Sequence, residues 1–226
     1  MNERANNPFE VPATISETIY KYLKKAIIEG EFKPNQRVQE KEIAGLFNVS
    51  TTPVRESFRR LAAEKFLTID ARRGIVVIST SLDQIKDLFE VVTVLDVFAT
   101  KRGIKSLPRE AIDQLKQMTR ELGESYREKK ILDYVKKNFE IHFKIWEYCG
   151  NEFLRGALTD YGEKIVFHMN QFFLLLPEQA TYFDKSYGDH LDLLAAIENK
   201  DEAQVERILL SHWGKDFLGE TDSEAG

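Results

Sequence analysis

The chain of 226 residues lacks features that mark several protein classes. It has one cysteine, Cys149, so no internal disulfide can form, which excludes a disulfide-stapled secreted scaffold. Its most apolar run, residues 166–176, is interrupted by polar residues and is far too short to span a bilayer. Neither a signal peptide nor a transmembrane segment is recognisable. We therefore expect a cytoplasmic protein with no membrane association.

An overall basic charge is also lacking, since the formal net charge is −5 at pH 7. That value alone argues against a nucleic-acid partner, but the charge is unevenly divided. Residues 1–80 contain 13 Lys/Arg and 10 Asp/Glu, and the remainder contains 19 Lys/Arg and 27 Asp/Glu. A basic N-terminal part followed by an acidic part favours an N-terminal nucleic-acid-binding domain.

Residues 48–60 are the most informative segment, because they predict a DNA-recognition helix. Ser50 and the threonines after it can cap the helix, and Pro53 suits its first turn. The residues that recur at helical spacing and can face a core are Val54, Phe58, Leu61 and Ala62. Arg55, Arg59 and Arg60 are left on other faces, where they are either groove-reading cations or an ordinary solvated surface.

The surrounding pattern supports a winged helix-turn-helix. Amphipathic helices are expected at 15–29 and 39–47, the second joined to the recognition helix by a tight break. After Lys65 the pattern changes to two β-rich runs, 66–69 and 75–78, separated by a basic tip. Such a hairpin can act as a wing against a phosphate backbone or minor groove.

Residues 14–79 resemble the winged-helix domain of the GntR superfamily of bacterial transcription regulators. The segments that carry the resemblance are Ile28–Pro34, Glu42–Ala44, Val49–Ser50, Thr52–Glu56 and Gly74. The resemblance implies DNA contacts from Lys41 and Arg55, with a DNA-contacting wing. The full set of candidate DNA-binding residues is Lys41, Ser50, Thr51, Thr52, Pro53, Arg55, Arg59, Arg72, Arg73 and Gly74.

Two departures from the family pattern matter. Asn35 follows the loop proline where the family usually has Gly, and Asn tolerates the positive φ that such a turn needs. Thr51 stands where the family usually has an Arg that reads a base edge. The operator sequence therefore cannot be transferred from the family.

The second half predicts an all-α antiparallel bundle after a joint at residues 79–81. Expected helices are 82–106, 108–129, 131–149, 151–176, 178–199 and 201–218. The expected apolar stripes are Leu88, Val91, Val92, Leu95 and Phe98, and then Leu191, Leu194, Ala195 and Ile197. The predicted organisation is a flexible arm (1–13), the winged-helix domain (14–79), an effector-binding and dimerisation domain (80–220) and a flexible tail (221–226).

This bundle resembles the FCD-type ligand-binding domain of the FadR branch. The resemblance implies a homodimer that places two recognition helices on a palindromic operator in double-stranded DNA. It also implies control by a small organic acid that binds in the bundle, with repression relieved by the effector as the commoner mode.

The four histidines are His142, His168, His190 and His212. His190 and His212 lie ten and twelve residues from the turn near residue 200, so antiparallel helices bring them to similar heights, about 15–18 Å from that turn. With His142, three imidazoles from three helices can converge, which suits a divalent metal such as zinc or nickel. The alternative is that each is a hydrogen-bonded core residue.

The family resemblance favours the metal. Its metal-binding members use an Asp and a His four residues apart, then two further His, and His142, His190 and His212 match these positions. Asn138 occupies the place of the Asp, and its amide oxygen can ligate but carries no charge. The metal identity and affinity therefore stay open.

The effector is not readable from the sequence. In the family a small carboxylate metabolite often binds the metal directly, at its free coordination positions. His168 lies on the intervening helix and is a candidate to line that pocket, with a plain packing role as the alternative. Val92 stands where the family frequently has an Arg, so one usual cation is missing.

The leading hypothesis is a ligand-responsive transcription regulator, probably acting as a repressor in the family's usual mode. The alternatives are a metalloenzyme that uses the three-His site, or a metal sensor or structural metal site. Against an enzyme, Glu140 points away from His142, and Gly-rich phosphate loops and Ser/His/Asp or Cys/His nucleophile arrangements are absent from the sequence.

Overall fold

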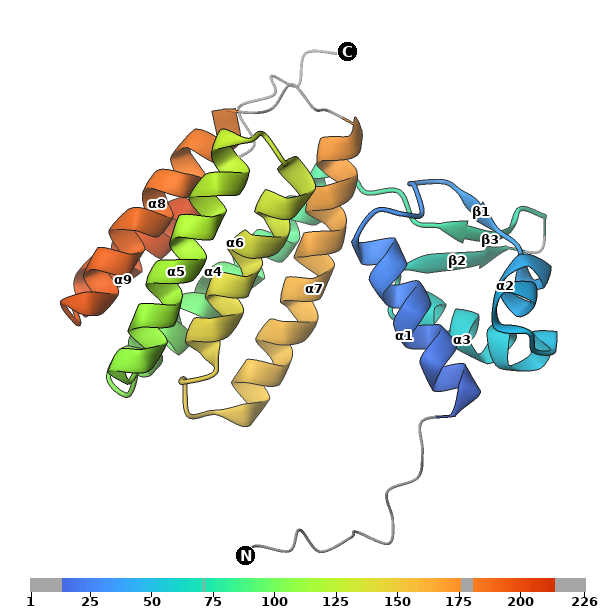
Figure 1. The fold of residues 1–226 in the computed structure, drawn as a ribbon, viewed down its shortest axis with the longest axis horizontal. Helices are drawn as coiled ribbons and strands as arrows, with labels where there is room; N and C mark the ends of the chain where they lie inside the picture. The colour runs from blue at the N-terminus through green and yellow to red at the C-terminus, as the bar shows by residue number, and fades with distance from the viewer. Residues whose placement is uncertain (1–13, 71, 176–180, 214–226) are drawn as a thin grey trace, which may run out of the picture. The chain divides into compact units, whose positions relative to one another are not determined.

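The computed structural model describes residues 14–70, 72–175 and 181–213 (Figure 1). The chain divides into two compact units between Ser79 and Thr80. We call them the winged-helix unit and the helical unit. The arm at 1–13 and the tail at 221–226 that the sequence predicts lie outside the described residues.

The winged-helix unit combines three helices with a three-stranded antiparallel sheet of order β1-β3-β2. Its elements are α1 (Ile15–Ile28), β1 (Arg37–Val38), α2 (Glu40–Phe47), α3 (Thr51–Ala63), β2 (Leu67–Asp70) and β3 (Gly74–Val77). The helix-turn-helix and the hairpin are as predicted. Strand β1 was not predicted, and it pairs Arg37 with Val76 at the outer side of β3.

Residues with a left-handed backbone conformation (positive φ) form two turns of this unit. Asn48 ends α2 with φ 52°, which permits the tight break before α3. Asn35 adopts φ 62°, so the turn that usually uses glycine survives here, as the sequence predicted. Packing of α1 against α3 encloses the core of the unit. Its most enclosed side chains are Ile19, Leu23, Ile27, Val54, Phe58, Leu61, Phe66 and Leu67.

The helical unit contains only helices among its described residues. They are α4 (Leu82–Gly103), α5 (Arg109–Arg127), α6 (Ile131–Trp146), α7 (Glu152–Leu175), α8 (Thr181–Glu198) and α9 (Glu202–His212). Ser81 and Gln84 form a capping box that starts α4, and Asp201 caps α9. Helix α4 packs against α6, α7 and α9, and α8 packs against α5 and α9, as Figure 1 shows for the bundle.

The apolar stripe predicted for α4 is largely wrong. The buried face of this helix consists of Ile85, Phe89, Val92, Asp96, Ala99, Thr100 and Gly103. Of the predicted residues only Val92 is buried, while Val91 and Phe98 are exposed. Helix α4 carries apolar residues on two faces, and the periodicity alone identifies both without telling which one faces the core.

The stripe predicted for α8 is also largely wrong, since Ile197 is the one predicted member that is buried. Leu193, Ala196 and Ile197 are buried, whereas Leu191 and Ala195 are exposed. A shift of one residue on a helix turns a side chain by about 100°, which moves it from one face to another. None of the described helices is long and apolar enough to cross a membrane.

Candidate nucleic-acid interface and metal centre

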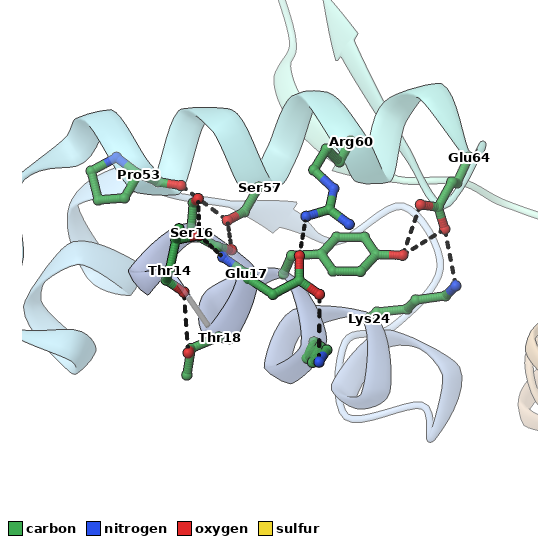
Figure 2. Close-up of polar contacts among 11 residues, drawn as sticks. Thr14, Ser16, Glu17, Thr18, Lys24, Pro53, Ser57, Arg60 and Glu64 are labelled. Atoms are coloured by element: carbon green, nitrogen blue, oxygen red, sulfur yellow. Dashed lines mark hydrogen bonds and ion pairs between the residues drawn. The ribbon is translucent and has the colours of Figure 1, made fainter. Parts of the chain in front are cut away.

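Helix α3 presents three different faces. Val54, Phe58 and Leu61 form the first and are buried in the core. A second face, at positions 53, 57, 60 and 64, turns toward α1 (Figure 2). The third face carries Thr52, Arg55 and Arg59, which are exposed. Spacings of three and four residues place each set along one side of the helix.

Polar contacts fix the second face of α3 on α1, as Figure 2 shows. Ser57 donates a hydrogen bond to the Ser16 carbonyl at 2.7 Å. Arg60 forms an ion pair with Glu17, and its guanidinium lies 3.8 Å from the centre of the Tyr20 ring. Arg60 is therefore engaged inside the unit. The outward face of α3 is left to Arg55 and Arg59.

The first turn of α3 is open to a ligand. Ser50 occupies the N-cap position, but its side chain makes no capping hydrogen bond. The exposed backbone N–H groups of a helix N-terminus suit a phosphate. Arg55 donates to Glu40 Oε2 at 2.8 Å, so α2 and α3 share this cation. Lys41, next to Glu40, is exposed as well.

The tip of the hairpin carries two exposed cations, Arg72 and Arg73. Their backbone N–H groups donate to Asp70 Oδ1 at 2.7 and 2.8 Å. These hydrogen bonds lower the pKa of Asp70, and the one from Arg73 has the larger effect. Gly74 has φ 78°, and the guanidinium of Arg37 lies so close that an added Cβ would be 3.2 Å from it.

Arg37 is a third cation beside the wing that sequence reasoning missed. It is exposed, and it reaches the wing because β1 pairs with β3. A two-residue strand is too short for periodicity to reveal, so no sequence signal placed it there. Of the predicted residues of α3, the structure thus places Thr52, Arg55 and Arg59 on one outward face, whereas Pro53 turns toward α1, and it adds Arg37 to the predicted wing cations.

Three of the four histidines come together in the helical unit. His142 of α6, His190 of α8 and His212 of α9 are buried. One ligand-capable nitrogen of each lies within 4.8 Å of the others. We call this group the three-histidine cluster. It forms because antiparallel α8 and α9 bring their two histidines to one level, as their distances from the turn predict.

Each ring of the cluster has its Nδ1 close to an oxygen. His190 Nδ1 donates to the Ser186 carbonyl at 2.7 Å, and His212 Nδ1 contacts Asp189 Oδ2 at 3.2 Å. His142 Nδ1 lies 3.0 Å from Asp96 Oδ2, although the ring is not aligned for a directed hydrogen bond. Within the described part of the chain, all three Nε2 atoms are buried without a hydrogen-bond partner. For His190 and His212, a hydrogen-bonded Nδ1 with a free Nε2 is typical of metal-binding imidazoles.

Asn138 adds a fourth unsatisfied donor atom. It lies one turn before His142 on α6 and is buried. Its amide nitrogen donates to Ser186 Oγ at 2.9 Å, which leaves Oδ1 buried and, among the described residues, without a partner. Buried polar atoms are nearly always satisfied. Three imidazole nitrogens and an amide oxygen form a donor set that fits a divalent cation.

Burial sets the protonation of the cluster. It lowers the pKa of His190 well below its ordinary value, and the neighbouring His212 and His142 act in the same direction. Burial also lowers the pKa of His212, against the raising influence of Asp189. Both rings are therefore neutral at pH 7, which is the form that binds a metal.

His168 is not a member of the cluster. Its Nδ1 lies 2.6 Å from Thr80 Oγ1, at the start of the helical unit. Burial, with a smaller influence of Lys164, lowers the pKa of His168 to about 4. Its role in an effector pocket stays a prediction. Glu140, the nearest acid to His142 along α6, is exposed and does not join the cluster.

Comparison with known proteins agrees with this architecture. Residues 15–77 match the family of bacterial regulatory proteins named gntR, and residues 87–215 match the FCD domain. The Nta operon transcriptional regulator of Aminobacter aminovorans is 27% identical over 191 residues, which cover 82% of this chain and 85% of that protein. The HTH-type transcriptional repressor RspR of Escherichia coli is 22% identical over 200 residues, covering 88% and 85%.

Solved structures show the same fold. Escherichia coli McbR/YncC superposes with a TM-score of 0.72 at 18% identity, covering 88% of this chain and 93% of that one. A putative GntR regulator from Rhodococcus sp. RHA1 gives a TM-score of 0.73 at 15% identity, with the same coverage. The chain therefore belongs to the GntR family of bacterial transcription regulators, as a member in which the DNA-binding domain precedes an FCD domain, and it is not an enzyme.

Proposed function

We propose that this protein is a homodimeric repressor whose affinity for DNA is controlled by a divalent metal and a small organic acid bound in the helical unit. The observation that carries the proposal is that ligand-capable nitrogens of His142, His190 and His212 lie within 4.8 Å of one another, while their Nε2 atoms and Asn138 Oδ1, one turn before His142, are buried without a partner among the described residues. A regulator that encloses such a set of donors, apart from its DNA-binding unit, has the two distinct sites that allosteric control needs.

The proposed DNA contacts divide into two classes. Thr51, Thr52, Arg55 and Arg59 face outward from α3 and suit base edges and phosphates of a major groove. The wing cations Arg72 and Arg73, joined by Arg37, suit the backbone or minor groove. Titration of the protein onto its own upstream region at several salt concentrations tests this. Binding without salt dependence or sequence preference would refute it.

The proposed dimer uses the outer face of α4. Val91, Val94 and Phe98 are 41%, 68% and 54% exposed and lie on one side of the helix, away from its buried face. We call them the α4 stripe. A second copy is the occupant we propose, because two half-sites of a palindromic operator require two recognition helices related by symmetry. Sedimentation velocity measures the association directly.

The proposed metal is zinc or nickel. Neutral imidazoles and an amide oxygen form a donor set of intermediate softness, which such borderline cations favour over magnesium or calcium. The bound ion would supply a positive charge and open coordination positions for a ligand. Elemental analysis of protein purified without a histidine tag tests the proposal, and a metal content near zero after growth with both metals would refute it.

The proposed effector is a small organic acid. A cavity of about 480 Å³ at the junction of α5, α6 and α8 is within the usual size of ligand pockets. Arg127, Lys129 and Lys130 line it together with Tyr134, and Asp184 is the one acid among its described lining residues. Melting curves with a panel of small mono- and dicarboxylates test the proposal, with Arg127→Ala expected to weaken the response.

A chain of hydrogen bonds connects this cavity to the proposed metal centre. The Tyr134 hydroxyl contacts Ser186 Oγ at 2.9 Å, and the same oxygen accepts the hydrogen bond from Asn138. A ligand that moves Tyr134 would thus disturb the residue that orients the Asn138 amide. Because coupling between two sites is reciprocal, removing the metal is expected to change the affinity for the acid by the same factor by which the acid changes the affinity for the metal.

A second candidate function is sensing of the metal itself. The three histidines of the cluster are buried, and none of them lines the cavity of about 480 Å³. In that case the metal alone changes the affinity for DNA. DNA titrations of metal-loaded and metal-stripped protein without any organic acid distinguish the two functions.

A further inference from the structure

Asp96 of α4 is an unusual residue of the helical unit. It is 0% exposed and is the only Asp or Glu among the described residues that is buried. An ionised carboxylate without solvent is costly unless it is paired and hydrogen-bonded. Burial acts to raise the pKa of Asp96, but contact with His142 and hydrogen bonds from two indoles outweigh it, so the pKa is lowered.

Donors from three helices hold the carboxylate. Thr100 Oγ1 and Trp146 Nε1 donate to Oδ1 at 2.8 and 2.6 Å. Trp213 Nε1, directly after α9, donates to Oδ2 at 2.9 Å, and the same oxygen lies 3.0 Å from His142 Nδ1. Both oxygens are thus engaged. Asp96 does not belong to the group whose ligand atoms lie within 4.8 Å of one another.

The charge of the proposed metal centre explains why a carboxylate is buried at position 96. Three imidazoles and one amide bring no negative charge to a divalent cation. Transferring an uncompensated double charge into a buried site carries a large desolvation cost. The carboxylate of Asp96, which lies against His142, is the one buried carboxylate among the described residues, while the half-buried carboxylate of Asp189 contacts His212.

We propose that Asp96 is a positioning residue of the metal centre. It keeps His142 with Nδ1 toward the carboxylate and Nε2 toward the ion, and it supplies the negative charge that Asn138 does not. The inference rests on the proposed metal site. It also ties that site to α4, the helix that follows the joint at residues 79–81 and carries the α4 stripe.

The test measures zinc affinity of the full-length, untagged protein by competition with a chromophoric chelator. Asp96→Asn is expected to weaken zinc binding roughly 10- to 100-fold, the usual cost of losing an outer carboxylate. The matched control is Asp113→Asn, which removes the same charge from an exposed position on α5 and should leave the affinity within twofold.

A rescue separates positioning from plain structural support. Asn138→Asp places a charge directly on the ligand set, so the double variant Asp96→Asn/Asn138→Asp should regain most of the lost affinity. A purely structural role of Asp96 predicts no such recovery. Thr100→Val, which removes one donor to Asp96 but keeps its charge, should lower the affinity only a few fold and serves if Asp96→Asn does not fold.

The outcomes are distinguishable. If the unaltered protein takes up no zinc, nickel or cobalt, the metal site itself fails and the inference fails with it. If the unaltered protein binds zinc and the folded Asp96→Asn variant binds it within twofold, the metal site stands and only the role of Asp96 is overturned. Loss of affinity in Asp96→Asn without recovery in the double variant would likewise overturn charge compensation.

Discussion

The winged-helix unit keeps its functional cations in solvent, whereas the helical unit encloses its functional imidazoles. Arg55 and Arg59 are exposed, while every ring of the three-histidine cluster is buried. Exposed charges contribute little to folding and can be exchanged for DNA contacts, with a strong dependence on salt. Buried neutral groups without partners lower stability until a ligand satisfies them. The same chain thus loses little stability at its candidate DNA-binding surface and more at the three-histidine cluster.

Replacing one histidine of the three-histidine cluster should give the largest effect, a loss of the stabilisation by zinc. Zinc at 1,000 times its dissociation constant stabilises a folded site by about 4 kcal/mol. His142→Ala is expected to abolish this gain in the melting transition of the helical unit. His168→Asn is the control, since His168 contacts Thr80 and is not in the cluster. A zinc-induced shift of unchanged size in His142→Ala would contradict the proposed site.

Disrupting the α4 stripe should give the second-largest effect, a weaker dimer. Val94→Glu places a charge at the most exposed position of the stripe, where the monomer tolerates it but a symmetric interface would bury it twice. We expect dimer dissociation to become easier by about 3 kcal/mol or more. Sedimentation velocity over a range of concentrations measures this. Phe153→Glu, at a 92% exposed position on α7, is the control, and equal behaviour of the two variants would count against this interface.

Acid should destabilise the helical unit through His168. Its folded pKa of about 4 lies below the ordinary value of 6.5, so only the unfolded state gains a proton between these values. The free energy of unfolding is therefore expected to fall as the pH drops from about 6.5 to 4, by on the order of 2 kcal/mol. Urea titrations of metal-free protein measure it. His168→Asn should reduce that slope, to which His190 and His212 also contribute, and an identical slope would contradict the assignment.

The smallest effect distinguishes two arginines of one helix. Arg59→Ala should weaken DNA binding by about 1 kcal/mol and reduce the salt dependence by roughly one phosphate contact, with no change in the melting temperature. Arg60→Ala should instead lower stability by up to about 1 kcal/mol, because Arg60 pairs with Glu17 and covers Tyr20. Fluorescence anisotropy and thermal melting separate the two. The reverse pattern would mean that α3 presents a different face to DNA.

Sequence reasoning succeeded where the signal is local. The recognition helix and the hairpin could be predicted from caps, spacing and turn residues that lie within a few positions of one another. The convergence of His190 and His212 was also accessible, because a short turn fixes the relative heights of two antiparallel helices.

What the sequence did not reveal depends on packing between distant helices. Asp96 reads as one acid beside an apolar stripe, and only the approach of Trp146 and Trp213 turns it into a buried hydrogen-bonded group. The face of α4 that enters the core was misjudged for the same reason. Arg37 was missed because its two-residue strand has no periodicity of its own.

The most direct test of coupling between the two units is the affinity of the full-length protein for its own upstream DNA, measured by anisotropy with the metal bound and after chelation. An unrelated duplex of equal length and composition provides the reference. We expect sequence-preferring, salt-dependent binding whose affinity differs at least fivefold between the two metal states. Equal affinity in both states, with or without organic acids, or equal affinity for both duplexes, would contradict the account.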